Sequence, residues 1–217
     1  MSNATRIIAV RHGETAWNVD TRIQGQLDID LNARGRWQAE RVADALADES
    51  IDAIYASDLL RAKTTAQAIA ARTVSTRANE VRLHPGLRER GFGIFEGLTY
   101  AQISSDWPDE SRRWRQREPD FAPEGGETLL RLRKRVADTL DALASQHLGE
   151  QIVLVAHGGI MDALYRLATQ QDISAPRTWD LGNAAINRLL WTPESLTLVG
   201  WADVRHLDDS TVDEISA

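Results

Sequence analysis

Short runs of apolar residues recur along the chain and predict the strands of a sheet. Four runs are continuous rather than alternating, and they cover residues 6–10, 51–56, 81–83 and 152–156. Continuous apolar character is typical of parallel strands, which are buried on both faces between layers of helices. Two further runs, at residues 185–191 and 196–201, flank a turn at 192–194 and predict a hairpin near the end of the chain.

Between these strands, apolar side chains recur at the spacing of one helix face. Such stripes occupy residues 32–46, where Asn32 can cap the helix, and residues 59–70 and 132–143, the last ending near Gly149. Strands and helices therefore alternate. This order predicts the α/β class, as a three-layer α/β/α sandwich with right-handed crossovers around a mostly parallel central sheet.

The length of 217 residues suits one domain, which we expect to span residues 1–207. Residues 98–126 differ in character, because they combine tryptophans and prolines with the pair Gly125-Gly126. They predict short helices and loops that leave the sheet and form a lid-like excursion. Residues 208–217 are acidic and polar, and we expect them to fray.

Composition narrows the function classes. Hydrophobic residues make up 42% of the chain, which favours a folded globular protein. The absence of cysteine excludes disulfides, thiolate catalysis and cysteine-based metal sites. The net charge of −7 argues against nucleic-acid or anionic-membrane partners, which need a broad positive field. No apolar segment suits secretion or membrane spanning, so we expect a cytoplasmic protein. The sequence leaves open whether the protein forms a homodimer.

Two of the predicted strands end in a histidine followed by glycine. One strand leads into Arg11-His12-Gly13 and another into His157-Gly158-Gly159. The carboxyl ends of parallel strands meet at one edge of a sheet, where ligands commonly bind. The adjacent glycines would let a ligand approach the backbone closely. Taken alone, each histidine could be a metal ligand, a nucleophile or a packed side chain.

Arg61 lies in the first turn of the helix that follows residues 51–56, and Glu89 comes shortly after residues 81–83. We expect both side chains to lie at the same sheet edge. Arginine forms charge-assisted, often bidentate hydrogen bonds with phosphate oxygens. Two guanidinium groups would also repel a divalent metal ion. The residues therefore predict a phosphate-binding pocket that uses no metal and no cofactor.

Four segments carry a resemblance to a known family. The stretches "RHGETAWN" (11–18), "SDLLRAKTTA" (57–66), "LRERGFGIFEGL" (87–98) and "VAHGG" (155–159) resemble the successive motifs of the histidine phosphatase superfamily. The likeness spans residues 6–160 and implies a phosphoglycerate-mutase-like fold without a metal. It implies that His12 is the nucleophile that accepts the phosphoryl group. It also implies that Arg11, Arg61 and His157 bind the phosphoryl oxygens with help from Asn18, and that Glu89 is the general acid and base.

Some assignments leave alternatives open. Gln24 and Gly25, in "RIQGQLDIDLNARG", resemble the family's segment that lines the substrate pocket, although a simple turn would also explain Gly25. Arg61 on its own could be a solvated helix residue. Other carboxylates near Glu89 could replace it as the acid, namely Glu96, Asp106 and Glu110.

The resemblance favours the phosphatases of the family over its mutases, because the chain lacks a long insertion and the sequence "ERHYG" around the acid. We therefore expect a phosphomonoesterase that acts on a small phosphorylated metabolite through a phosphohistidine. The alternative is a phosphoglycerate mutase with the same phosphohistidine chemistry. A third hypothesis is a phospho-ligand-binding module that has lost catalysis.

Overall fold

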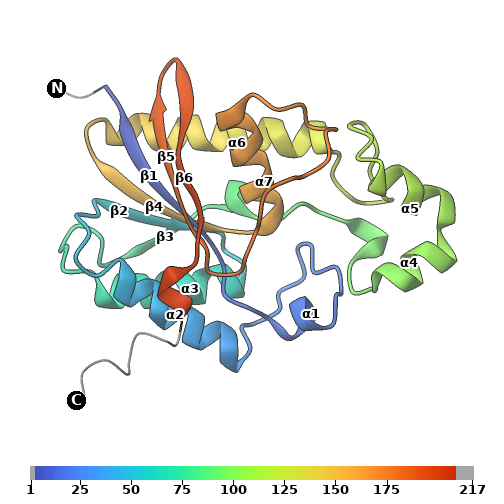
Figure 1. Cartoon of the computed structure of the whole chain (residues 1–217), viewed down its shortest axis with the longest axis horizontal. Helices are drawn as coiled ribbons and strands as arrows, with labels where there is room; N and C mark the ends of the chain where they lie inside the picture. The colour runs from blue at the N-terminus through green and yellow to red at the C-terminus, as the bar shows by residue number, and fades with distance from the viewer. Residues whose placement is uncertain (1–2, 209–217) are drawn as a thin grey trace.

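The computed structural model describes residues 3–208, which form a six-stranded sheet between two layers of helices (Figure 1). The strand order is β3-β2-β4-β1-β5-β6. The predicted three-layer α/β/α class is confirmed. The fraying expected from residue 208 onward falls, beyond Asp208, outside the described residues.

The first four strands are parallel, as predicted, although the edge strand β3 is half-buried to exposed. They are β1 (Thr5–Arg11), β2 (Ala53–Ala56), β3 (Val81–Leu83) and β4 (Gln151–Ala156). The predicted terminal hairpin is also present, as β5 (Ile186–Thr192) and β6 (Ser195–Asp203). Strand β5 runs antiparallel to β1, so the sheet is mostly rather than wholly parallel.

Two long helices cover each face of the sheet (Figure 1). Helices α2 (Ala33–Ala45) and α3 (Leu60–Arg72) pack on one face, and α6 (Leu129–Ala144) and α7 (Gly158–Thr169) on the other. Asn32 caps α2 as predicted, since its side chain accepts a hydrogen bond from the Gly35 N–H at 2.7 Å. The stripes at 59–70 and 132–143 correspond to α3 and α6, whereas the sequence pattern had not identified α7.

Short helical turns connect these elements. They are α1 (Ala16–Val19) and the 3-10 turns η1 (Pro85–Leu87), η2 (Gly93–Phe95), η3 (Ser145–His147) and η4 (Arg205–Leu207). No helix within residues 3–208 has the length and apolar character needed to cross a membrane.

Alternate residues of the inner strands enter different cores. In β1, Ile7 and Ala9 pack with α6 and α7, whereas Ile8 and Val10 pack with α2 and α3. Successive side chains of a strand point to opposite faces, so burial on both faces requires an uninterrupted apolar run. This arrangement is the physical reason why the strands could be recognised in the sequence.

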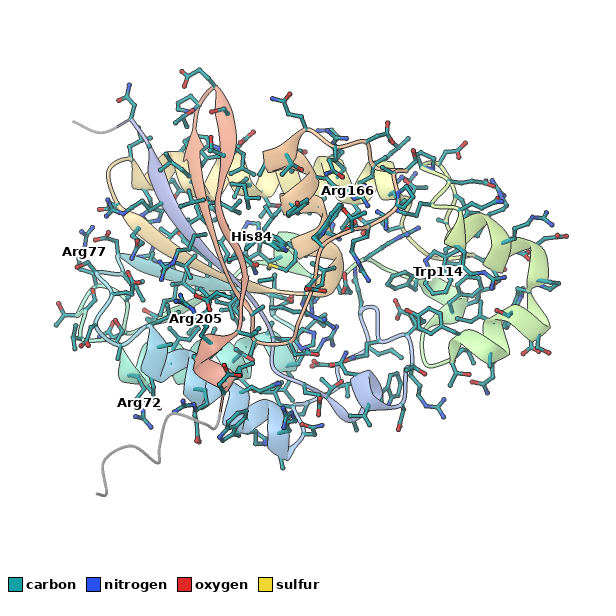
Figure 2. All side chains as sticks on the ribbon, viewed as in Figure 1. Arg72, Arg77, His84, Trp114, Arg166 and Arg205 are labelled. Atoms are coloured by element: carbon teal, nitrogen blue, oxygen red, sulfur yellow. The ribbon has the colours of Figure 1, made fainter. Side chains whose placement is uncertain are left out.

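The excursion at residues 98–126 holds two short helices, α4 (Tyr100–Asp106) and α5 (Pro108–Arg115), which extend to one side of the sheet (Figure 1). Its Ile103 shares a small core with Ile23 and Phe95, against which Trp107 and Trp114 pack. Figure 2 shows Trp114 on the inner side of α5. Its indole stacks on the Tyr100 ring with the centroids 5.3 Å apart.

The two faces of α6 should contribute differently to stability. Leu143 is 4% exposed within the core, whereas Leu130 on the same helix is 51% exposed. Leu143→Ala should lower the free energy of unfolding by roughly 2–5 kcal/mol, because it removes buried methyl groups and leaves a cavity. Leu130→Ala should lower it by less than about 1 kcal/mol. Urea unfolding measures both, and equal losses would contradict the packing described.

Candidate active site

The pairing of β1 with β4 brings the two strand-end histidines together. The strands are parallel and in register, with Arg11 opposite Ala156. The backbone N–H of His12 donates to the Ala156 carbonyl at 2.9 Å, and His157 follows Ala156 directly. As a result, the His12 and His157 rings lie side by side with their centroids 5.2 Å apart.

A cavity of about 160 Å³ opens in front of these rings at the carboxyl edge of the sheet. Seven of the eight predicted site residues line it: Arg11, His12, Asn18, Gln24, Gly25, Arg61 and Glu89. The eighth, His157, is fully buried against His12. The structure therefore brings the whole predicted set to one place.

His12 is 3% exposed, and its tautomer follows from one contact. Its Nδ1 lies 2.7 Å from the Gly13 carbonyl oxygen, which can only accept, so Nδ1 carries the proton. In the neutral ring, Nε2 then holds a free lone pair. Burial, followed by the positive charges of Arg61 and Arg11, keeps the pKa of His12 well below its ordinary value of 6.5.

His157 is equally buried, and burial together with Arg61 holds its pKa well below 6.5. Among residues 3–208, neither ring nitrogen of His157 has a hydrogen-bond partner. A neutral imidazole still offers one N–H donor. His157 can therefore donate to an anion without adding a fixed positive charge to the pocket.

Arg61 is 1% exposed and is held by the loop that precedes α2. Its Nη1 donates to the Leu27 carbonyl at 2.8 Å and its Nη2 to the Gly25 carbonyl at 2.7 Å. These bonds leave other guanidinium donors, including Nε, available for a ligand. The hypothesis of a solvated helix arginine is wrong for Arg61, since the side chain is buried.

The backbone conformation and the nearby Glu96 side chain explain why position 25 is a glycine. Its φ of +51° favours glycine, and a Cβ there would lie 2.1 Å from Oε1 of Glu96. Glu96 fills this space and accepts hydrogen bonds from the backbone N–H groups of Gln26 and Phe92, at 3.1 and 2.8 Å. Glu96 thus shapes the loop that holds Arg61, whereas Glu89 lines the cavity. Of the described residues, neither Asp106 nor Glu110 lines this cavity.

Two contacts orient the remaining polar groups. Arg11 donates from Nη1 to the Leu181 carbonyl, and burial lowers its pKa while the negative charge of Glu89 opposes that change. Asn18 closes a capping box with Thr15 at the start of α1, accepting the Thr15 N–H at 3.0 Å through Oδ1. Its Nδ2 takes no part in this box and is the donor that it can offer to a ligand.

Glu89 is positioned by the N-terminus of α7. The Gly159 N–H points at both carboxylate oxygens, at 3.0 and 3.1 Å. A negative charge is stabilised at this end of a helix. A Cβ on Gly159 would lie 2.3 Å from Glu89 Oε1, so only glycine leaves room for the carboxylate.

The glycines beside the histidines were expected to let a ligand approach the backbone, but the structure gives them a packing role. A Cβ on Gly13 would lie 2.3 Å from the backbone oxygen of Gly35, so the space is filled by α2 and not by a ligand path. After His157, Gly159 makes room for Glu89, whereas a Cβ on Gly158 would make only ordinary contacts, the shortest at 3.6 Å with Arg11. The missing side chains of Gly13 and Gly159 therefore serve the packing of the site.

Two residues of the excursion, Tyr100 and Trp114, also line the cavity, together with Arg22, Ile23 and Phe92 from earlier in the chain. Arg113, next to Trp114 on α5, pairs with Glu118 at 2.6 Å and does not line this cavity. No spacing rule links these positions to the strand edge, since the contacts depend on how the excursion folds back.

Unpartnered polar atoms concentrate at this site. Within residues 3–208, five of the seven buried side-chain nitrogen and oxygen atoms without a hydrogen bond belong to Arg11, Gln24, Arg61 and His157. Buried polar groups are normally satisfied, so this concentration indicates a site for a polar ligand. Four of the five are nitrogens, and three of these can donate to an anion, since the neutral ring of His157 carries one N–H. Over the same residues, no three histidine or acidic side chains gather as a metal site.

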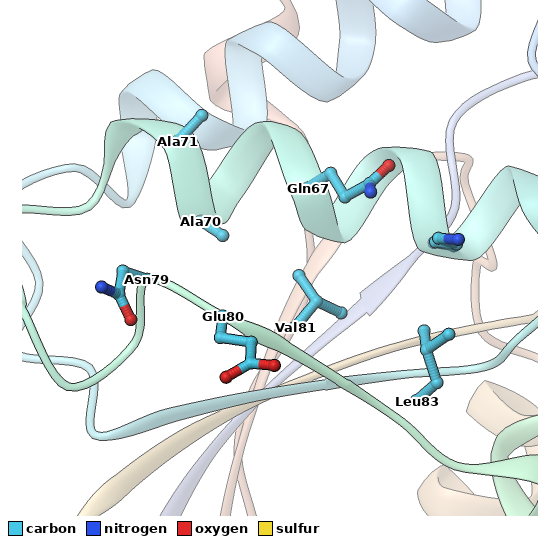
Figure 3. A pocket seen from close by; sticks show the side chains of 8 residues that line it. Gln67, Ala70, Ala71, Asn79, Glu80, Val81 and Leu83 are labelled. Atoms are coloured by element: carbon cyan, nitrogen blue, oxygen red, sulfur yellow. The ribbon is translucent and has the colours of Figure 1, made fainter.

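A second hollow lies elsewhere on the molecule, between α3 and the edge strand β3 (Figure 3). It measures about 350 Å³ and contains Lys63 and Glu80 among apolar and amide side chains. None of the predicted site residues lines it. Its size alone gives no reason to prefer it over the cavity at His12.

Comparisons with known proteins agree with this geometry. The histidine phosphatase superfamily (branch 1) model matches residues 7–204. Phosphoglycerate mutase-like protein 4 of Arabidopsis thaliana is 40% identical over 207 residues, covering 94% of this chain and 87% of that protein. A metal-independent phosphoserine phosphatase of the same plant is 38% identical over 208 residues, covering 95% and 84%.

A solved structure also matches. It is a phosphoserine phosphatase from Entamoeba histolytica in complex with 3-phosphoglyceric acid. The TM-score is 0.80 at 30% sequence identity, over 94% of this chain and 100% of that one.

The buried imidazoles predict how stability varies with pH. In the unfolded chain both histidines titrate near 6.5, whereas their pKa in the folded protein lies well below this value. Below pH 6.5 the unfolded state therefore binds more protons, and the free energy of unfolding falls as the pH falls. Between pH 7.5 and 5.5, each imidazole should account for a loss of about 1 kcal/mol.

Urea unfolding at the two pH values tests this expectation. His157→Asn should reduce the loss between pH 7.5 and 5.5 by about 1 kcal/mol, because it removes one of the two groups. The same substitution at the half-buried His84, which lies outside the cavity, serves as the control. If the free energy of unfolding of His157→Asn falls as much between pH 7.5 and 5.5 as that of the unsubstituted chain, the pKa of His157 is not lowered in the folded protein.

Proposed function

The chain belongs to the histidine phosphatase superfamily and is an enzyme that hydrolyses phosphate esters, and we propose that it does so through a covalent phosphohistidine on His12. One observation carries this proposal. Buried nitrogens of Arg11, Arg61 and His157 lack hydrogen-bond partners within residues 3–208, and these side chains lie at the cavity that His12 lines. They offer donors for an anion beside a neutral imidazole whose Nε2 lone pair is free to act as the nucleophile.

In the first step, His12 Nε2 attacks the phosphorus atom and an N–P bond forms as the P–O ester bond breaks. Glu89, in its protonated form, gives its proton to the departing oxygen. Because the pKa of His12 is low, the ring needs no base to free its lone pair. The products of this step are the alcohol and the phosphohistidine.

In the second step, a water molecule attacks the same phosphorus atom. Glu89, now ionised, accepts a proton from the water as the O–P bond forms and the N–P bond breaks. Inorganic phosphate leaves, and His12 and Glu89 return to their starting states. The Gly159 N–H that holds both Glu89 oxygens supports this double role, since it fixes the carboxylate for both steps.

The surrounding donors supply the remaining acceleration. Hydrolysis of phosphate monoesters needs up to about 10²¹-fold acceleration, whereas one general acid contributes roughly 10²–10⁴-fold. Arg11, Arg61 and His157 are fixed before the substrate arrives, so they stabilise charge on the phosphoryl oxygens without reorganisation. The carbonyls of Gly25, Leu27 and Leu181 fix the guanidinium groups in this arrangement.

We further propose a small phosphorylated metabolite as the substrate, and among these a phosphorylated hydroxy or amino acid. The similar proteins named above support this class, because one is a phosphoserine phosphatase and another is solved with 3-phosphoglyceric acid. Phosphoglycerate mutase activity is the second candidate, which the name of the first relative favours. The acceptor of the phosphoryl group, water or a substrate hydroxyl, separates the two.

Removal of the nucleophile tests the mechanism. With p-nitrophenyl phosphate as substrate, His12→Ala should lower kcat by roughly 10³-fold or more, because no covalent intermediate can form. His84→Ala, a histidine outside the cavity, is the matched control and should retain activity within about twofold. Full activity in His12→Ala would refute the assignment. With 3-phosphoglycerate, release of inorganic phosphate is expected, and formation of the 2-isomer without phosphate would indicate the mutase.

The position of Glu89 can be tested without changing it. Gly159→Ala places a methyl group 2.3 Å from Glu89 Oε1, so the carboxylate must move. Because small displacements of catalytic groups are costly, kcat should fall by about 10²-fold while the fold is kept. Gly200→Ala is the control, since its Cβ would make only an ordinary contact at 4.0 Å with Arg188. Equal activity of the two variants would argue against Glu89 as the acid and base.

A further inference from the structure

The cavity at His12 does not end at the phosphate pocket. A second compartment of about 420 Å³ lies beside it toward α7, and Arg11, Phe92, Tyr100 and Trp114 line both. The first compartment, at about 160 Å³, is smaller than the roughly 300–1,000 Å³ of common ligand pockets. A substrate whose phosphate occupies the first compartment has the second beside it for its remaining atoms.

Four arginines line the second compartment, and one of them, Arg11, is shared with the first. Of the other three, two are already engaged. Arg90 donates to the carbonyls of Glu127 and Phe121 at 2.7 and 3.1 Å, and Arg117 pairs with Asp162 at 2.7 Å. The third, Arg177, is exposed, and no residue between 3 and 208 engages its guanidinium in a hydrogen bond or ion pair. It is the cation of this compartment that is free to meet a ligand.

The loop that carries Arg177 is anchored on both sides. Arg166, which is labelled in Figure 2, donates to the carbonyls of Asp172 and Ala175, the latter at 2.8 Å. Its Nε donates to Asp162 at 3.0 Å. After Arg177, the Trp179 ring stacks on Tyr165 with the centroids 4.0 Å apart. A free guanidinium on a fixed loop is suited to recognition, since little backbone order is lost on binding.

Arg177 also acts on the neighbouring pocket. Burial is the main cause that lowers the pKa of Arg11, and the positive charge of Arg177 lowers it further. The two guanidinium groups therefore lie near enough to influence each other. An anion between them would relieve this repulsion.

From this arrangement, we propose that Arg177 binds the carboxylate of the substrate while the phosphate lies at His12. The inference rests on the proposed function and narrows its substrate to phosphorylated acids. A carboxylate suits the compartment better than a second phosphate. The phosphate pocket offers two guanidinium groups and two imidazoles, whereas the second compartment offers one free guanidinium, which matches a group with a single negative charge.

Two substrates that differ only in this group test the proposal. 3-Phosphoglycerate carries a carboxylate where sn-glycerol 3-phosphate carries a hydroxymethyl group. The ratio of their kcat/KM values should fall by roughly 10- to 100-fold in Arg177→Gln, through a higher KM for 3-phosphoglycerate, and Arg177→Lys should restore part of it. Arg112→Gln removes the same charge from exposed α5 outside the compartment, and its ratio should stay unchanged.

The outcomes separate this inference from the proposed function. An unchanged ratio in Arg177→Gln, or no preference for 3-phosphoglycerate in the unsubstituted enzyme, overturns the carboxylate site while hydrolysis of p-nitrophenyl phosphate still supports the phosphatase. If no phosphate ester is hydrolysed, the proposed function fails. In that case, the dissociation constants of the same two compounds are measured by calorimetry for the unsubstituted chain and for Arg177→Gln. An unchanged ratio of the two constants overturns the carboxylate site, and a roughly 10- to 100-fold fall in the preference for 3-phosphoglycerate supports it.

Discussion

The parallel pairing of β1 with β4 holds His12 and His157 at one edge of the sheet, and the remaining site residues are arranged around that pair. Both strands are buried on both faces, so a shift in register would expose apolar side chains and is disfavoured. The pairing thereby fixes the separation of the two rings. It also directs the N-terminus of α7, which follows β4, toward Glu89.

A group of cations at this edge creates an energetic problem, because buried charge without compensation is costly. The structure limits the cost in two ways. The imidazoles stay neutral, since burial and the neighbouring guanidinium groups lower the pKa of both. The guanidinium groups are held by backbone carbonyls and face the carboxylate of Glu89. What stays unpartnered is a set of donors, and a phosphate group can satisfy them.

The sequence was sufficient for those parts of the molecule that follow from local pattern. Continuous apolar runs predicted the parallel strands, and the rule that ligands bind at their carboxyl ends predicted that Arg11, His12, Arg61, Glu89 and His157 would meet. The role of Gly13 was misjudged, because its contact with Gly35 on α2 joins elements that only the tertiary fold brings together. Helix α7 could not be recognised from its start, because it begins with the pair Gly158-Gly159 and glycine is a poor helix former.

The two compartments differ in how they are built, and this difference explains what could be predicted. The phosphate pocket stands on strand ends and helix termini, where short motifs specify position, so its chemistry can be inferred from sequence. The second compartment is assembled from the excursion and from α7 with the loop around Arg177 that follows it, and these two parts are far apart in the chain. Rigid elements thus support the reacting groups, while loops and the excursion surround the rest of the substrate. Substrate choice can therefore change through residues such as Arg177 without any change in the motifs around His12.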